Sequence, residues 1–400
     1  MKNFILHDPK LLVYGFLIIF FASYGQTFFI ALFNDDIKKL YGLTDGEFGM
    51  VYAISTTLSS LLLINFAKLI DFVDLRIYSF LVTLGLLLAC LAIYFLPENI
   101  IFLFIIIFAL RFFGQGAMSH AGITSMTRYF GENKGKAISI GNLGGMLGVM
   151  LLPIVVVYLN KFYDFKTIWL FCSLSIILFL PILYFTLNDQ NERQNKFNES
   201  IKESKEIWTT LQVTKDKKFL TFLPLTISFP FISTGLMFHQ IFIFTQKGWT
   251  LEMLGTGFIF LGAFSIFGLL FGGPLIDMLN PKKAVLFLLL PIFVGVIVLL
   301  LFDNFYFLII YMSLYGMNLG ISAPFIGSLW AQLFGLESLG TVKALFHAIG
   351  VLASALSPVV FGFLIDWGFG IKAICAISLF IIIASSLLPI IFDRDEQRNN

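Results

Sequence analysis

The sequence predicts an all-α membrane protein whose twelve transmembrane helices form two pseudo-symmetric six-helix bundles. Three observations lead to this fold class. First, the 400 residues are 58% hydrophobic and only 12% charged, whereas a soluble chain carries about 25% charged residues. Second, apolar runs of about 20 residues, long enough to cross a bilayer, recur between short polar loops. Third, motifs of the first half return in the second half at a nearly constant offset.

Each apolar run is predicted to be a helix, because a backbone surrounded by hydrocarbon must satisfy its own hydrogen bonds. The first run has no convincing small-residue cleavage site, so we interpret it as a retained helix and not as a signal peptide. The predicted spans are residues 11–33, 46–70, 77–96, 99–127, 137–159, 166–187, 219–245, 252–276, 283–302, 304–333, 344–365 and 371–392.

The distribution of basic residues predicts the orientation. With the N-terminus in the cytoplasm, 19 Lys and Arg residues fall on the inner side and 6 on the outer side, and Arg111 completes the 26. Basic residues accumulate in cytoplasmic loops. We therefore expect a multi-pass protein of the inner or plasma membrane of the cell, with both termini cytoplasmic.

The longest polar stretch, residues 188–218, divides the spans six and six. Its charges of mixed sign at helical spacing predict a short surface helix within a linker that acts as a tether without a binding role. The predicted organisation is an N-terminal six-helix bundle (1–187), a cytoplasmic linker (188–218) and a C-terminal six-helix bundle (219–400).

Short motifs of the two halves can be superimposed, which indicates a duplicated six-helix unit. The matched pairs are Phe21-x-Ser23-x-Gly25 with Phe231-x-Ser233-x-Gly235 at an offset of 210, Leu69-Ile70-Asp71 with Leu275-Ile276-Asp277 at 206, and Gly116 with Gly320 at 204.

Two six-helix halves joined by a cytoplasmic linker are the construction of the major facilitator superfamily (MFS), which the chain resembles over essentially its whole length. The loop Ala67-Lys-Leu-Ile-Asp71-Phe-Val-Asp-Leu-Arg76 is similar to the family motif between helices 2 and 3, although Ala67 replaces its leading Gly and its inner Gly is missing. Arg111-Phe-Phe-Gly114-Gln-Gly116 is similar to the helix 4 motif. The stretch Arg128-Tyr-Phe-Gly-Glu-Asn-Lys-Gly-Lys-Ala137 looks like the monocarboxylate and oxalate/formate porter group. The resemblance implies the MFS fold and a secondary transporter.

Arg111 is the charge at greatest depth in an apolar run. A guanidinium at the bilayer centre costs roughly 2.5–3.5 kcal/mol on insertion scales, so it is rarely kept without a task. Arg111 and Gln115 lie four residues apart on one helix face, and Tyr315 is the repeat counterpart of Arg111, with Asn318 on the same stripe. We expect both stripes to line a central cavity. The alternative for Arg111 is a structural pin bonded to carbonyls of helix 1 or 5.

Helices 1 and 7 are the other inner walls that the resemblance implies, and helix 11 adds one histidine. For each histidine the alternative is a packing residue with satisfied hydrogen bonds. The predicted substrate-binding residues are Arg111, Gln115, Tyr315, Asn318, Tyr24, Gln26, His239, Gln240 and His347.

Two carboxylates end cytoplasmic helix tips at equivalent places of the repeat. Each could accept hydrogen bonds from a neighbouring helix N-terminus or pair with a nearby basic side chain, and the alternative is an ordinary solvated charge. The resemblance implies that such loops hold the cytoplasmic side closed. The predicted gating residues are Asp71, Arg76, Arg128, Asp277 and Lys282.

A deep cation without an acidic residue at comparable depth predicts an anionic substrate, namely a small organic acid moved by alternating access. Symport with a proton could use a histidine, since imidazole titrates near neutral pH. The chain has no phosphate-binding loop and no cluster of catalytic residues, so ATP-driven transport and enzyme activity are not expected. We expect no cofactor, no metal and no nucleic-acid partner, and a monomer in the bilayer.

Two other functions stay open. An exporter of amphipathic or drug-like compounds would suit an interior rich in the 49 Phe residues, and it would depend little on Arg111. A non-transporting, transporter-like sensor would bind a ligand without flux.

Overall fold

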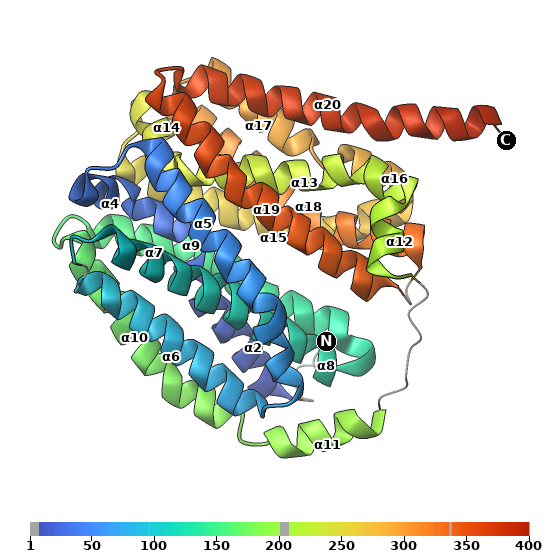
Figure 1. Ribbon diagram of the computed structural model, residues 1–400, viewed down its shortest axis with the longest axis horizontal. Helices are drawn as coiled ribbons and strands as arrows, with labels where there is room; N and C mark the ends of the chain where they lie inside the picture. Colours follow the sequence, from blue (N-terminus) through green and yellow to red (C-terminus); the bar gives the residue numbers. More distant parts are fainter. Residues whose placement is uncertain (1–7, 96, 201–207, 336–337, 400) are drawn as a thin grey trace. The chain divides into compact units, whose positions relative to one another are not determined.

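The computed structural model describes residues 8–95, 97–200, 208–335 and 338–399, without the side chains of 132, 198–200, 277, 340 and 392–399. Throughout these residues the regular structure is helical (Figure 1). The chain forms two compact units. Unit 1 is Met1–Leu43 with Met50–Lys202, and unit 2 is Thr44–Gly49 with Glu203–Asn400.

The described residues contain 11 helices long and apolar enough to cross a membrane. A twelfth span is a bent pair, Pro9–Gly25 and Thr27–Tyr41, whose two parts differ in direction by 46°. The predicted all-α membrane fold is confirmed. The first span is bent, however, where the sequence predicted one uninterrupted run.

Unit 1 contains the first six spans, apart from Thr44–Gly49 at the start of the second, and a surface helix. Several of its helices begin after capping side chains, as at Asp164, which accepts a hydrogen bond from the backbone N–H of Thr167 at 2.7 Å. That bond lowers the pKa of the Asp164 carboxyl. The helices are α2 (Pro9–Phe21), η1 (Ala22–Gly25), α3 (Thr27–Ile30), η2 (Ala31–Phe33), α4 (Asn34–Tyr41), α5 (Asp45–Phe66), η3 (Ala67–Asp71), α6 (Leu75–Tyr94), α7 (Ile100–Ala109), η4 (Leu110–Met118), α8 (Ser119–Tyr129), η5 (Gly131–Asn133), α9 (Lys134–Leu159), α10 (Phe165–Thr186) and α11 (Gln190–Ser200).

Unit 2 contains the last six spans. The helices are α12 (Thr210–Lys215), α13 (Lys217–Phe238), α14 (Gln240–Gln246), α15 (Leu251–Leu279), α16 (Pro281–Ala284), η6 (Val285–Phe287), α17 (Leu290–Leu301), α18 (Phe305–Phe334), α19 (Leu339–Asp366) and α20 (Gly370–Asn399). Helices α15 and α18 approach closely, because a Cβ atom on Gly316 or Gly320 would lie 2.1 Å from the carbonyl oxygen of Leu261 or Ser265. Small residues permit such contact between membrane helices.

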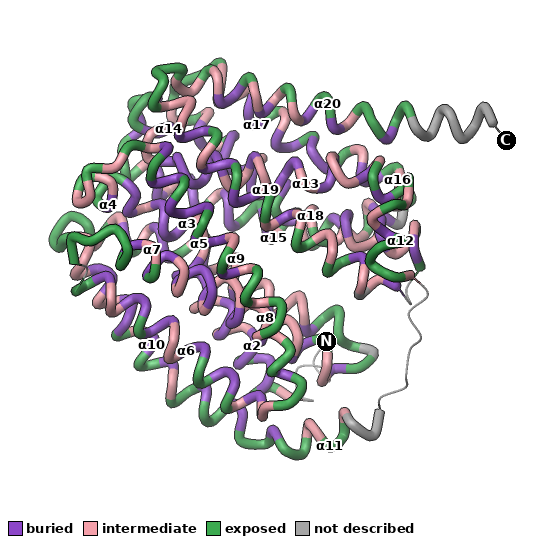
Figure 2. The backbone as a smooth tube through the Cα atoms, in the orientation of Figure 1, coloured by how far each residue is buried: buried purple, intermediate pink, exposed green. Residues whose placement is uncertain are grey.

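Many large apolar side chains are exposed along the spans, for example Leu178 (73%) and Phe380 (71%). Figure 2 shows buried and exposed stretches alternating along single helices. Exposed apolar patches of this extent mark contact with another apolar phase. The outward faces of both units are therefore suited to lipid.

The predicted linker contains two helices, and each is bonded to the unit that it belongs to. In unit 1, Arg193 of α11 pairs with Asp8 through Nε at 2.5 Å, and Gln190 donates to the hydroxyl of Tyr129 at 2.7 Å. In unit 2, the backbone N–H of Trp208, two residues before α12, donates to Ser338 at 3.1 Å. Helix α11 is thus docked on its unit, and does not hang free of it.

Candidate functional site

The first membrane-spanning helix, which begins with α2 and η1 and continues as α3, is broken within unit 1 (helix 1 below). Its course tightens to a 3₁₀ turn at η1, and Gln26 then adopts an extended backbone with φ −83° and ψ 152° before α3 begins at Thr27. A break in a membrane helix frees backbone groups that must find other partners. The carbonyl oxygen of Gly25 lies at this break and accepts a hydrogen bond from Nη1 of Arg111 at 3.0 Å.

The fourth membrane-spanning helix (helix 4 below) consists of α7, η4 and α8. It is irregular as well, because its middle part η4, Leu110–Met118, forms a π-helix. π-helical turns are rare and occur frequently at functional sites. The two irregular segments touch backbone on backbone. A Cβ atom on Gly25 would lie 2.1 Å from the carbonyl oxygen of Leu110, and one on Gly114 would lie 2.7 Å from Cα of Gly25. Glycine is therefore required on both sides of this crossing.

Arg111 lies in the π-helix with only 2% of its surface exposed. Its Nε donates to the hydroxyl of Thr56 at 3.1 Å, and its Nη1 donates to Gly25 and, at 3.4 Å, to the hydroxyl of Thr27. The guanidinium carbon lies 5.0 Å from the ring centre of Tyr52. Neutral oxygens and an aromatic face therefore hold the cation.

The charge of Arg111 is not balanced by an acid. No carboxylate of a described residue lies within ion-pairing distance of its guanidinium, and Nη2 donates no hydrogen bond to a described residue. A buried charge is costly unless it is paired. Dipoles and a π face compensate only part of that cost, so the arrangement suits a negatively charged partner.

The sequence-based hypothesis left two roles open for Arg111, which are binding of an anion and a structural role through bonds to backbone carbonyls. The geometry contains the hydrogen bond to a carbonyl of helix 1 that the structural role requires. Tyr52 and Thr56, which complete the cage, were missed by the sequence analysis. Their spacing of four residues on α5 places them on one helix face, and this is the signal that could have found them.

The other candidates of unit 1 differ in their surroundings. Gln26 lies at the helix break and Gln115 lies within the π-helix, and both are partly exposed. Tyr24 is 5% exposed, and its hydroxyl lies 2.8 Å from that of Ser175 on α10. Gln115 follows Arg111 by four residues, and Gln26 follows Gly25, whose carbonyl oxygen Arg111 contacts. Tyr24 instead packs against α10.

In unit 2, the two candidates of helix α18 are engaged with different neighbours. The hydroxyl of Tyr315 donates to the carbonyl oxygen of Ser233 on α13 at 3.0 Å. The carboxamide oxygen of Asn318 accepts the backbone N–H of Ile292 at 3.2 Å, near the start of α17. The predicted stripe therefore bonds to two helices.

The remaining candidates of unit 2 are two histidines and a glutamine. His239, at the junction of α13 and α14, is 2% exposed, and its Nε2 lies 2.9 Å from the carbonyl oxygen of Pro358. Gln240 follows it and is buried. His347 lies on α19 and is exposed.

Comparison with known proteins decides the family. A model of the Major Facilitator Superfamily matches residues 15–358, which is most of the chain. The chain belongs to the major facilitator superfamily. Two solved structures of a bacterial homologue of the human lysosomal transporter Spinster, inward-facing and either unoccupied or occupied, resemble this MFS chain with TM-scores of 0.67 and 0.66.

Both similarities have 15% sequence identity and cover 96% of this chain, with 94% and 96% of the other chain covered. At this identity they support the MFS fold alone. No curated protein sequence matches the chain. The protein is therefore a multi-pass membrane protein with the fold and family of MFS transporters.

The loop after helix 2, which carries the MFS motif, ends in an ion pair. Asp71 pairs with Arg128, which also donates to the carbonyl oxygen of Ile70 at 3.1 Å. Arg76 instead lies 3.9 Å from Asp74. Of the predicted gating residues, Arg128 and not Arg76 therefore pairs with Asp71.

The second copy of this MFS loop is less fully described. The side chain of Asp277 lies outside the described residues. Lys282 is the second residue of α16 and donates its backbone N–H to Asn280 and Gln332, each at 3.1 Å. These bonds fix the turn and say nothing of a gating role.

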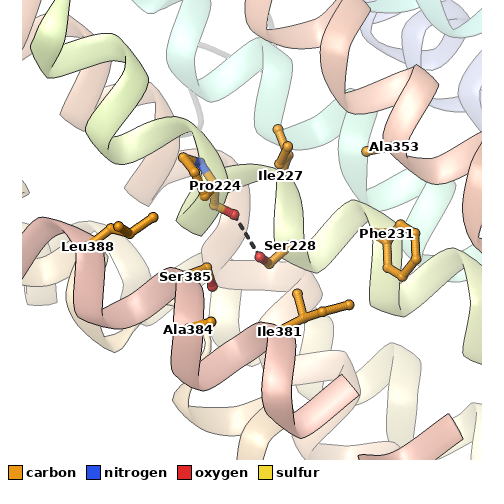
Figure 3. A pocket seen from close by; sticks show the side chains of 9 residues that line it. All are labelled: Pro224, Ile227, Ser228, Phe231, Ala353, Ile381, Ala384, Ser385 and Leu388. Atoms are coloured by element: carbon orange, nitrogen blue, oxygen red, sulfur yellow. Dashed lines mark hydrogen bonds between the residues drawn. The ribbon is translucent and has the colours of Figure 1, made fainter. Parts of the chain in front are cut away.

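A cavity of about 440 Å³ lies in unit 2 between α13, α19 and α20 (Figure 3). Its two hydroxyl groups, on Ser228 and Ser385, donate to carbonyl oxygens of their own helices at 2.6 and 3.2 Å. The cavity thus offers an apolar wall and no charge, and it contains none of the predicted site residues of this MFS chain. Its lining is Pro224, Ile227, Ser228, Phe231, Ala353, Ile381, Ala384, Ser385 and Leu388.

Proposed function

We propose that this protein moves a small organic anion, a carboxylate, across the membrane by alternating access, and that Arg111 binds the anion. The observation that carries the proposal is a buried guanidinium without a carboxylate partner among the described residues. Two unit charges in a low-dielectric interior attract far more strongly than in water. A carboxylate beside Arg111 would therefore bind where a neutral analogue would not.

The cage around Arg111 supports this role because it orients the guanidinium. Thr56 and Gly25 hold Nε and Nη1 in place, and an arginine fork that is already fixed loses less entropy when it binds. A charge-assisted hydrogen bond from Nη2 is the contact left for the anion. Tyr315 and Asn318 already bond within unit 2, so the proposal depends chiefly on Arg111.

We further propose that transport is coupled to a proton. His347 supports this idea, because it is an exposed imidazole within a span, and imidazole changes charge near neutral pH. The orientation with both termini in the cytoplasm and a monomeric state belong to the same proposal.

The test is a thermal-shift screen in detergent with formate, acetate, lactate and oxalate, each set against its neutral amide. Wild type is compared with Arg111→Gln and with Arg193→Gln, a control that removes a guanidinium from surface helix α11. At least one acid should stabilise wild type and the control, and should leave Arg111→Gln unshifted. Stabilisation by neutral compounds alone, equal in all three proteins, would contradict the proposal.

A second candidate function is export of amphipathic compounds, which the apolar cavity of unit 2 favours. Here the ligand would lie against Phe231 and Ile381, and Ala353→Phe would fill the space. This candidate predicts that amphipathic cations and neutral compounds stabilise wild type and Arg111→Gln equally, and that Ala353→Phe abolishes the effect.

A further inference from the structure

The cage around Arg111 contains one hydroxyl-bearing residue that is not fully buried. Thr27 begins α3, directly after the break at Gln26, and is partly exposed. The other two hydroxyl groups of the cage belong to Tyr52 and Thr56, which have 0% and 1% of their surface exposed. Thr27 therefore carries the hydroxyl group of the cage that a solute can reach.

The hydroxyl oxygen of Thr27 is already an acceptor. Nη1 of Arg111 donates to it at 3.4 Å, and the hydroxyl oxygen of Tyr52 lies 2.6 Å away, which is at the short end of the range for such bonds. A phenol is more acidic than an aliphatic alcohol, so Tyr52 is the donor of this pair. A hydroxyl group has two acceptor positions, and both positions of Thr27 are thus filled.

The proton of the Thr27 hydroxyl is the hydrogen-bonding group that remains. With Tyr52 as the donor of their pair, no described residue accepts a hydrogen bond from Thr27. Two incoming hydrogen bonds polarise an O–H group and strengthen it as a donor. A strengthened donor next to a guanidinium suits an oxygen that carries negative charge.

The partly exposed residues next to Thr27 are polar. Gln26 precedes it in the chain. Gln115 lies on the facing π-helix, where a Cβ atom on Gly25 would lie 2.8 Å from the backbone nitrogen of Gln115. Both glutamines are partly exposed. The accessible edge of the cage therefore carries polar residues, as a solute with a polar group requires.

We propose that the hydroxyl of Thr27 donates a hydrogen bond to one oxygen of the bound carboxylate, while Arg111 binds the same group. Tyr52 is then a positioning residue, because its hydroxyl fixes the direction of the Thr27 proton. A carboxylate has two acceptor oxygens, so the two donors can be satisfied together. This assignment rests on the proposed function, since it names a second contact at the same anion site.

The first test measures affinity for the acid that best stabilises wild type, by titration of the melting temperature in detergent. Thr27→Val removes the hydroxyl and should weaken acid binding by about tenfold or more. Thr27→Ser keeps the hydroxyl and should restore most of the affinity. The matched control is Thr127→Val, which removes a hydroxyl that donates to the carbonyl oxygen of Ile123 in its own helix. This control should bind the acid as wild type does.

Tyr52→Phe tests the direction of the hydrogen bond between Tyr52 and Thr27. The variant keeps the ring beside the guanidinium of Arg111 and removes only the hydroxyl that directs the Thr27 proton. Acid binding should weaken, by less than about tenfold, because the proton is no longer oriented. Stronger binding by Tyr52→Phe would mean that Thr27 donates to Tyr52 in wild type, and would overturn the assignment.

Solute protection separates a direct contact from a structural role of Thr27. In Thr27→Cys the new thiol is labelled with a small methanethiosulfonate, and the native buried Cys90, Cys172 and Cys375 are internal controls. Labelling at each position is followed by mass spectrometry. A saturating concentration of the acid should slow labelling at position 27, and the neutral amide of the same acid should not.

The results distinguish this assignment from the proposed function. If Arg111→Gln bound the acid as wild type does, both proposals would fail. If acid binding required Arg111 but was unchanged in Thr27→Val, the assignment of Thr27 alone would fail. Equal labelling at position 27 with and without the acid would also overturn the assignment of Thr27 and leave that of Arg111 standing.

Discussion

Arg111 in unit 1 and Tyr315 in unit 2 occupy equivalent positions of the repeat, and both donate a hydrogen bond to a backbone carbonyl of the first helix of their own unit. Arg111 donates to Gly25 and Tyr315 to Ser233, both at 3.0 Å. A hydrogen bond from a side chain to a backbone carbonyl thus occurs at the equivalent position of each unit. Only the copy in unit 1 is charged, and the proposed anion site rests on this difference.

The backbone around the two bonds differs as well. In unit 1 a broken helix meets a π-helix, whereas α18 of unit 2 runs unbroken from Phe305 to Phe334. Gly25 touches the backbone of helix 4, but its repeat counterpart Gly235 faces the ring of Phe361. Backbone irregularity costs free energy and collects at functional sites. The comparison therefore places the backbone irregularity beside Arg111 and not beside Tyr315.

The largest expected effect is that of Arg111→Gln on transport. Loss of a charge-assisted contact of about 1.5–3 kcal/mol should lower carboxylate uptake by about 10- to 100-fold. Arg111→Lys should restore little of it, because an ammonium cannot reproduce the fixed fork that bonds Thr56 and Gly25. Uptake into proteoliposomes measures both, and Tyr315→Phe is the matched variant of unit 2. Equal losses in Arg111→Gln and Tyr315→Phe would show that the charge is not what matters.

The second effect compares the two glycines. Gly25→Ala should destabilise the protein by about 1–3 kcal/mol, because its Cβ meets a backbone oxygen that cannot move aside. Gly235→Ala should cost less, since the ring of Phe361 can shift. Thermal unfolding of the two variants in detergent, beside wild type, gives the order. If Gly235→Ala lowered the melting temperature as much as Gly25→Ala, the crossing in unit 1 would not be the tighter one.

A smaller effect is expected for Thr56, which accepts the hydrogen bond from Nε of Arg111. Thr56→Val keeps the shape but leaves a buried donor without a partner, which costs about 1–3 kcal/mol at most. Carboxylate affinity should fall while the amides remain without effect. Thr56→Ser retains the hydroxyl and should behave as wild type in the same titration.

The smallest effect is predicted for Tyr315→Phe. It removes one neutral hydrogen bond to Ser233, worth about 1 kcal/mol. The melting temperature should fall slightly, and the selectivity for acids over amides should not change. A loss of that selectivity would mean that the hydroxyl contacts the solute, and unit 2 would then share the anion site.

The sequence predicted the fold well because its signals were long and repeated. Apolar runs and motif offsets extend over the whole chain, so a local irregularity such as the break at Gln26 did not disturb them. The break itself carried no local signal. No proline or glycine pair marks it, and it depends on the contact between Gly25 and helix 4, which only the folded chain brings together.

The site was predicted in part. Arg111 could be singled out because a deep charge is costly wherever it points. The bonding partners of the candidate residues could not be predicted. Helical spacing places Asn318 on a polar stripe, but it does not tell which neighbouring helix that stripe faces. Asn318 bonds to Ile292. Thr56 and Tyr52 were not predicted as contacts of Arg111, because single hydroxyl groups are common in membrane helices.

Solute counterflow tests the central claim most directly. Proteoliposomes loaded with the unlabelled carboxylate that best stabilises wild type are diluted into the same radiolabelled acid, and accumulation of label is followed over time. Wild type and Arg193→Gln should accumulate the acid transiently and Arg111→Gln should not, while the neutral amide should not accumulate with any of them. Equal accumulation of acid by wild type and Arg111→Gln would contradict the assignment of Arg111 as the anion site.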